Sequence, residues 1–179
     1  MPTPSIDTPT VVSILVEKHT EVVVQDCTEH TFYINGQEYQ KLPLDANVRE
    51  PNTQKSKPYK EMIKTLQESP KDFFENNLGI SVIATKIDKK KVINNKEMYE
   101  FVFQSGTGIL NGGHTQQAII DSKDNPNISD AIVKVSVRVK NYTLSRIAEI
   151  AAAQNSSTAV KEYTLAEKKG LFIPIKKHY

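Results

Sequence analysis

The stretch that decides the fold of this 179-residue chain is Gly108-Ile109-Leu110-Asn111-Gly112-Gly113-His114-Thr115-Gln116-Gln117-Ala118. Its apolar beginning predicts a buried strand over 107–110, and the spacing of the apolar residues after it predicts a helix over 114–121. The two glycines between these elements permit a positive φ and a close approach of a ligand to the backbone. The first N–H groups of the helix would then suit an anion. The alternative is that Gly112-Gly113 only makes a tight strand-to-helix turn.

Outward from this junction, the chain alternates between strand and helix patterns. Expected strands cover 10–16, 21–25, 80–84, 100–104 and 131–139, and expected helices cover 59–67, 70–75, 143–153 and a segment from about 161. Asn35-Gly36 between β-forming runs predicts a hairpin, Ser69 is the expected N-cap of the 70–75 helix, and 86–96 reads as a charged hairpin connection. The mixture predicts an α+β fold with a small mixed or antiparallel sheet and packed helices. We expect a disordered tail over 1–8, a β-hairpin region over 9–42 and a core over 43–179.

Composition excludes several classes of protein. The chain has one Cys and 38% hydrophobic residues, and no apolar run approaches the roughly 18–20 residues that span a bilayer. The single Cys27 rules out a disulfide scaffold and a Cys-rich zinc site. The N-terminus lacks the charged and apolar regions of a signal peptide. These features predict a cytoplasmic protein with no membrane partner.

The net charge of +2 conceals an asymmetry between the two ends of the chain. Residues 1–50 carry three basic and eight acidic side chains, whereas residues 51–179 carry 20 basic and 13 acidic ones. A basic region points to an anionic partner such as a nucleotide or nucleic acid. Solubility is the alternative explanation of the same charges.

Four segments contain residues that could bind a ligand. At the junction, Thr115 could cap the helix or contact a phosphate, and His114 could bind an anion or move a proton. Amide side chains recur at the ends of other elements, where capping and ligand binding are both open readings. Arg49 lies in a polar loop and is the right group to clamp a phosphate. The residues singled out beyond the junction are Arg49, Asn77, Gly79, Gln154 and Asn155.

Several catalytic chemistries have little support in the sequence. The four histidines are scattered, and no pair has the spacing of metal ligands along the chain. The chain contains no P-loop, no G-x-S-x-G and no H-E-x-x-H motif. We therefore expect no bound metal among the site residues and name no catalytic residue other than the candidate His114.

Taken in order, the four segments resemble the AIPR family, named for abortive-infection phage resistance. The family pattern has N-x-R in a loop, N-x-G-I before a buried strand, N-G-x-Q-T opening a helix, and a helix ending in N-x-Q or a close variant. The matching segments are Asn47-Val48-Arg49, Asn77-Leu78-Gly79-Ile80, Asn111-Gly112-Gly113-His114-Thr115 and Gln154-Asn155-Ser156. The resemblance covers roughly residues 42–173, with His114 in place of the usual Gln.

The third motif is also similar to the D-G-Q-H-R element of DndB-like proteins and the G-x-R-R element of ParB-type domains. Gln116 and Gln117 stand where ParB-type domains have their Arg pair. This second resemblance implies a ParB-like α+β core, in which the strand–turn–helix element binds a nucleotide or catalyses phosphoryl chemistry. Because AIPR proteins are usually longer, we expect the core to continue beyond residue 179 or the chain to be a short family member.

The resemblance implies a phage-defence module that binds a nucleotide or a nucleic-acid phosphate at the junction. A metal-dependent nuclease is one alternative, with Mg²⁺ as its cofactor, and a non-enzymatic interaction or sensor module is another. A second copy of the chain or another component of the defence system is a further expected partner. The proposed ligand-binding residues are Arg49, Asn77, Gly79, Asn111, Gly112, Gly113, His114, Thr115, Gln154 and Asn155.

Overall fold

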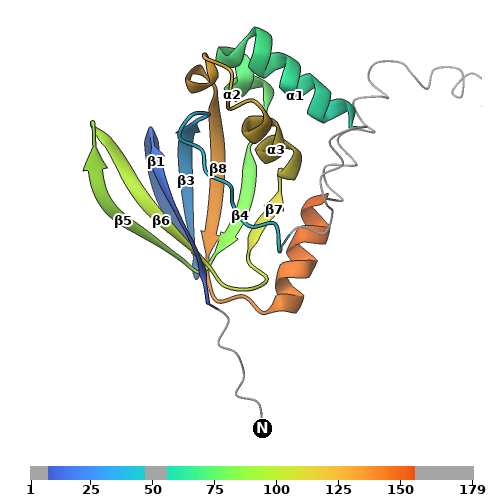
Figure 1. Ribbon diagram of the computed structural model, residues 1–179. Coiled ribbons are helices and arrows are strands. Elements are labelled where there is room, and N and C mark those ends of the chain that lie inside the picture. Colours follow the sequence, from blue (N-terminus) through green and yellow to red (C-terminus); the bar gives the residue numbers. More distant parts are fainter. Residues whose placement is uncertain (1–7, 47–55, 156–179) are drawn as a thin grey trace, which may run out of the picture.

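Two β-sheets and a group of helices make up the computed structural model, which describes residues 8–46 and 56–155 (Figure 1). The predicted α+β class is confirmed. Residues 1–7 of the tail expected over 1–8, the loop that carries Arg49 and the helix expected near residue 161 lie outside the described residues.

One sheet has three strands and the other has five. The three-stranded sheet has the order β1-β6-β5, and the five-stranded sheet has the order β2-β3-β8-β4-β7. All pairs are antiparallel except β4 with β8, which is parallel. The strands are β1 (Thr10–Val16), β2 (Lys18–Val24), β3 (Cys27–Asn35), β4 (Ile80–Ala84), β5 (Lys86–Ile93), β6 (Lys96–Phe103), β7 (Gly108–Asn111) and β8 (Ile132–Val139).

The N-terminal strands are built into both sheets. β1 pairs with β6, whereas β3 lies between β2 and β8. The chain passes from one sheet to the other at Glu17, between β1 and β2. The Glu17 carboxylate lies 2.8 Å from Nζ of Lys96 and accepts a hydrogen bond from Nδ2 of Asn35 at 2.6 Å. Glu17 therefore ties the start of β6 to the end of β3 at the corner between the sheets.

Short helices lie at one end of the five-stranded sheet (Figure 1). They are α1 (Lys57–Glu68), the 3₁₀ turn η1 (Pro70–Asp72), α2 (Phe73–Asn76), α3 (Gly113–Asp121) and η2 (Ile128–Asp130). Ser56 caps α1 by accepting from the N–H of Tyr59 at 3.4 Å, and a proline occupies the first turn. Ser69 is the N-cap residue before Pro70, as expected, but its side chain makes no capping hydrogen bond.

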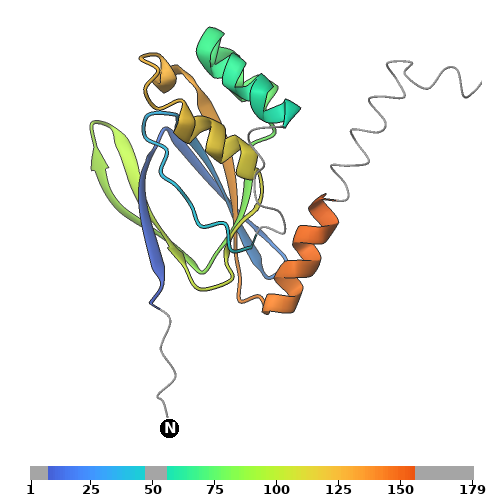
Figure 2. The same cartoon turned by 45° about the vertical axis from the view of Figure 1, so that its right-hand side comes forward.

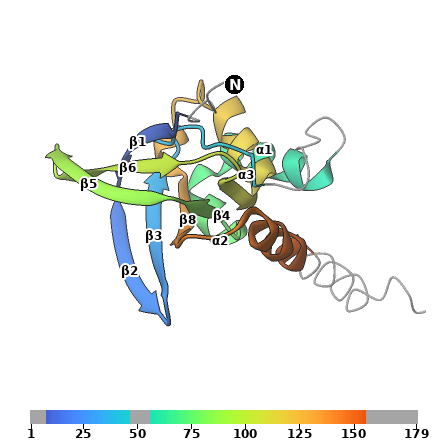
Figure 3. The ribbon, with the colours of Figure 1, turned by 90° about the horizontal axis from the view of Figure 1, so that it is seen from below.

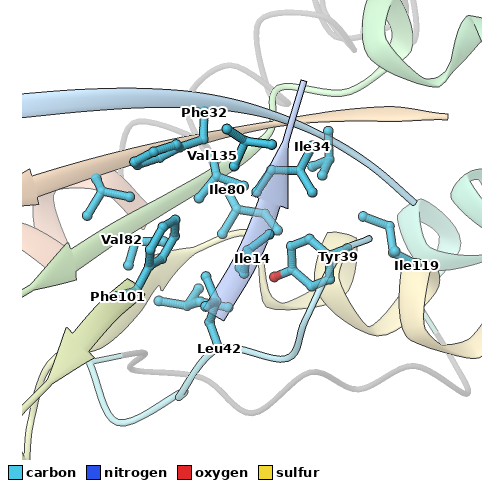
Figure 4. Close-up of a cluster of buried hydrophobic side chains, with 14 of the residues drawn as sticks. Ile14, Phe32, Ile34, Tyr39, Leu42, Ile80, Val82, Phe101, Ile119 and Val135 are labelled. Carbon is cyan, nitrogen blue, oxygen red and sulfur yellow. The ribbon is translucent and has the colours of Figure 1, made fainter. Parts of the chain in front are cut away.

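The main hydrophobic core fills the space between the two sheets and α3. Figure 4 shows Phe32 and Val135 from the five-stranded sheet, Phe101 from the other sheet, and Ile119 from α3. Each of these four side chains is at most 1% exposed. The strand expected over 131–139 is confirmed as β8, in which the buried Val133, Val135 and Val137 alternate with more exposed side chains.

A second apolar cluster packs a helical segment over 144–155, orange in Figures 1 and 2, against the sheet. Ile147, Ile150 and Ala151 contact a cluster that contains Ile83 of β4 and Leu110 of β7. The helix and its start at Thr143 are confirmed, because Thr143 Oγ1 accepts from the N–H of Arg146 at 3.2 Å. The buried face of this segment is formed by Ile147, Ile150 and Ala151, whereas Leu144 is 67% exposed.

The hairpin predicted at Asn35-Gly36 is wrong. β3 ends at Asn35, whose Oδ1 accepts from the N–H of Glu38 at 2.9 Å and whose carbonyl accepts from the N–H of Tyr39 at 3.1 Å. Gly36 does not take the positive φ of a two-residue hairpin turn. These local bonds curl the chain so that Tyr39 enters the core.

The hairpins lie at two other places. β2 and β3 are joined at Gln25, which has φ +58°. The segment 86–96 is a strand and a turn rather than a connection, and Asn94 and Asn95 both have the positive φ of a type I′ turn. Seen from below, the β2–β3 and β5–β6 hairpins project from the body in different directions (Figure 3).

Candidate functional site

The strand–turn–helix junction has the geometry that the sequence predicts. β7 ends at Asn111, Gly112 has φ +103°, and α3 begins at Gly113. A Cβ on Gly112 would lie 2.9 Å from the carbonyl oxygen of Gly79 and 2.9 Å from Cα of Ile80. Gly112 is therefore required both by its left-handed conformation and by the backbone that passes beside it.

The 77–80 motif lies against the 111–115 motif. Asn77 accepts from the N–H of Gly79 at 2.8 Å, which makes the tight turn into β4. Its Nδ2 donates to Oγ1 of Thr115 on α3 at 3.1 Å. Gly79 has φ +87°, and a Cβ there would lie 2.3 Å from the carbonyl oxygen of Lys134. The 77–80 and 111–115 motifs, which are far apart in the sequence, are thus in direct contact in the structure.

Thr115 is not the cap of α3. The N-cap residue is Gly112, which provides no side-chain acceptor, and Thr115 turns inward with 4% exposure. The N-terminus of this nine-residue helix consequently has no side chain of its own over its first N–H groups.

His114 is the polar residue of the first turn whose bonding is incomplete. Its Nε2 atom is buried and has no hydrogen-bond partner among the described residues. Leaving a buried polar atom unpaired costs about 1–3 kcal/mol. An atom of this kind beside a helix N-terminus is suited to a ligand that completes its hydrogen bonding.

The remaining predicted residues occupy three different places. Asn111 is on β7, opposite Ser81 of β4. Gln154 and Asn155 are on the helical segment 144–155, beyond the buried Ala151. Arg49 lies outside the described residues. The contacts above join Asn77, Gly79, Gly112 and Thr115 directly, with Gly113 and His114 beside them on α3.

Two residues at the junction were missed from the sequence. Met62 of α1 accepts from Asn77 Nδ2 at 3.3 Å through its sulfur. Gln116 is 2% exposed, and its side chain binds the hydroxyl of Tyr39 and both backbone polar groups of Leu42 at 2.5–3.0 Å. Burial raises the pKa of Tyr39, so its hydroxyl remains a donor. The signal for Gln116 was its place one residue after Thr115 on a helix with a buried face.

Within residues 8–46 and 56–155, no group of three neighbouring His, Cys, Asp or Glu side chains lies at this junction. The described part of the junction therefore has no carboxylate cluster suited to a divalent metal. Asp121 lies at the far end of α3, where it accepts from Tyr59 at 2.5 Å and from Gln117 at 2.8 Å. The hydrogen bond to Asp121 raises the pKa of Tyr59 to about 12. Asp121 is thus engaged in linking α1 to α3.

The fold and this site define a class: an α+β domain with a glycine-rich strand-to-helix junction closed by an N-x-G turn. The AIPR protein family matches residues 44–179, so the chain belongs to that family. Membership implies a role in abortive-infection phage resistance. No curated protein and no solved structure matches the chain. In the part of the chain that the structure describes, no helix is long and apolar enough to cross a membrane.

Proposed function

We propose that this AIPR protein acts in phage defence by binding a phosphate group of a nucleotide or nucleic acid at the junction between β7 and α3. The observation that carries the proposal is the buried Nε2 of His114, which has no hydrogen-bond partner among the described residues. It lies in the first turn of a helix whose N-cap is a glycine. A phosphate oxygen would supply the missing acceptor for a protonated Nε2.

Helix electrostatics support a negatively charged ligand. The first N–H groups of a helix have no intrahelical acceptor, and the macrodipole places roughly half a positive charge there. Because Gly112 has no side chain, no capping oxygen occupies the first N–H groups of α3, and these groups can bind a ligand instead. The basic balance of residues 51–179 favours the same sign of partner.

The proposed roles of the other residues follow from their contacts. Asn77 holds Thr115 and the N–H of Gly79, and so fixes the wall of the site rather than the ligand itself. Asn111 is the last residue of β7, next to Gly112, and is a proposed ligand-binding residue on account of that position. Arg49, which lies outside the described residues, is proposed to neutralise phosphate charge. The expected place of binding is the cytoplasm. His114 is also the candidate residue to move a proton in a phosphoryl reaction.

Calorimetric titration of ribonucleotides and short oligonucleotides into the purified chain tests this proposal. We expect saturable binding that His114→Ala weakens by about tenfold or more, since a hydrogen bond to a charged group contributes about 1.5–3 kcal/mol. Asn111→Ala should weaken binding in the same direction. Gln117→Ala is the matched control, because it lies on the same helix and its amide binds Asp121.

Thermal melting distinguishes ligand binding from an interaction module that binds no nucleotide. A ligand that binds the folded state raises the melting temperature of the wild type. Folded wild-type protein whose melting temperature and titration are unchanged by every nucleotide and oligonucleotide would overturn the proposal. Equal binding by His114→Ala and Gln117→Ala would overturn the assignment of the site.

A further inference from the structure

A polar cluster lies at the corner between the two sheets, and its two histidines precede the residues that match the AIPR family. His19 and Glu21 are on β2, His30 is on β3, and Tyr99 and Glu97 are on β6. The side chain of His19 stacks on Phe32 with ring centroids 4.7 Å apart, and it contacts Tyr99 at the same centroid separation with the two rings tilted by 47°. The cluster therefore has a fixed hydrophobic floor and lies outside the junction described above.

The β2–β3 register brings the two histidines together although they are far apart in the sequence. Glu21 lies opposite His30, and His19 lies opposite Phe32, which is on the same face of β3 as His30. Nε2 of His19 lies 2.9 Å from Nδ1 of His30. One ligand atom from each of His19, Glu21 and His30 lies within 4.8 Å of the others.

The hydrogen bonds behind His19 determine which of its nitrogens is free to act as a ligand. The Tyr99 hydroxyl donates to the Glu97 carboxylate at 2.8 Å and lies 2.9 Å from Nδ1 of His19. Because the single hydroxyl proton is used on Glu97, Nδ1 of His19 must donate to the Tyr99 oxygen. The neutral ring then carries a lone pair on Nε2, which accepts the Nδ1 hydrogen of His30 at 2.9 Å. For a metal to bind between the two rings, that hydrogen must move to Nε2 of His30, which leaves a lone pair on Nδ1. A metal-ligating histidine commonly donates its other ring N–H to an oxygen that fixes its orientation, and the Tyr99 oxygen occupies that place here.

We propose that His19, Glu21 and His30 form a site for a divalent transition-metal ion of the zinc type. Two imidazoles and a carboxylate are a donor set that zinc accepts, with a fourth position open to water. Zinc–nitrogen bonds of about 2.0–2.1 Å in a tetrahedron place two nitrogens roughly 3.3 Å apart. The His19–His30 separation of 2.9 Å needs to widen only slightly. Glu21 is exposed, so the ion can enter from that side.

Tyr99 is the positioning residue of this site. It does not contact the metal, and its hydroxyl orients His19 through Nδ1. The Glu97 carboxylate is held in turn by Nζ of Lys89 at 2.8 Å. Replacing an outer partner of this kind weakens metal affinity by about 10–100-fold in proteins.

Titration of Zn²⁺ into the full chain without a histidine tag tests the proposal, followed by calorimetry and melting. We expect one Zn²⁺ per chain, a zinc-dependent rise in melting temperature, and a tetrahedral visible spectrum when Co²⁺ replaces Zn²⁺. His19→Ala should abolish binding, and Glu21→Gln and Tyr99→Phe should each weaken it by about 10-fold or more. Glu29→Gln is the matched control, because Glu29 is on β3 one residue from His30, where it pairs with Arg138.

Two results would overturn the site. One is folded wild-type protein with no stoichiometric zinc binding, which would leave the cluster as a hydrogen-bond network between the sheets. The other is zinc binding that is unchanged in both Glu21→Gln and Tyr99→Phe. These two variants keep the test decisive if the His19 or His30 variants fail to fold, because Glu21 is exposed and Tyr99→Phe preserves the aromatic packing.

Discussion

Replacing Gly112 with alanine should destabilise the protein severely, because it carries two free energy costs that add together. A non-glycine residue in the left-handed region costs about 1–2 kcal/mol, and Gly112 has φ +103°. The new Cβ would also lie 2.9 Å from the Gly79 carbonyl oxygen and from Cα of Ile80. Because both are backbone atoms, β4 must shift, and overpacking of this kind costs about 1–3 kcal/mol. The expected loss in the free energy of unfolding is therefore about 2–5 kcal/mol.

Gly106→Ala provides the matched control for this estimate. Gly106 also has a positive φ of +85°, but the nearest atom to its Cβ is Cδ2 of Leu144, the far end of a side chain that is 67% exposed. Leu144 can rotate away, so only the conformational cost of about 1–2 kcal/mol remains.

Urea unfolding measures the free energy of unfolding of both variants and thermal unfolding measures their melting temperatures, each followed by circular dichroism. In a chain of this length each kcal/mol lowers the melting temperature by about 2–4 °C, so Gly112→Ala should melt about 4–20 °C below the wild type and well below Gly106→Ala. Equal stability of the two variants would refute the argument that the Gly79–Ile80 backbone excludes a side chain at residue 112. The measurement needs no ligand and is independent of the proposed function.

Two further changes test other parts of the structure. Gln116→Leu should lower the free energy of unfolding by at least about 3 kcal/mol, because it leaves Tyr39 and both backbone groups of Leu42 without their hydrogen-bond partner, at about 1–3 kcal/mol each. The control Gln117→Leu should change the free energy of unfolding by less than about 0.5 kcal/mol. Similar values for the two variants would contradict the role of Gln116. Hydrogen bonds from Lys96 and Asn35 lower the pKa of Glu17 below its model-compound value of 4.5, so its carboxylate stabilises the fold above that pH and loses the effect as the pH falls. Glu17→Gln should therefore lower the free energy of unfolding by up to about 1 kcal/mol at neutral pH and leave it unchanged in acid, as measured by urea unfolding across pH. A loss of stability that persists in acid would show that the charge of Glu17 is not the cause.

The local pattern of the sequence determined most of the secondary structure. Alternating valines in β8 and the apolar start of β4 specify buried strands, because side chains in a strand point alternately to its two faces. The glycines at 79 and 112 marked tight turns, since only glycine readily takes the required φ. These features depend on near neighbours and can be read from the chain.

Hairpin positions were less predictable from the same chain. Asn35-Gly36 has the composition of a two-residue turn, yet Asn35 is held by Glu17 and its own loop, which overrides the local preference. Asn94-Asn95 makes a type I′ turn inside a segment whose lysines suggested a connection. Tertiary hydrogen bonds and strand pairing decided both outcomes, because the free energy differences between turn types are small beside them.

The sequence by itself determined that residues 77–80 and 111–115 contain tight turns at glycines. The family resemblance that those motifs suggested is confirmed. Only the tertiary structure placed Asn77 against Thr115, and only the β2–β3 register brought His19 to within 2.9 Å of His30. The physical reason is range. A φ angle depends on one residue and its neighbours, whereas a binding site depends on which strands pair and in which register, and that is decided by burial across the whole chain.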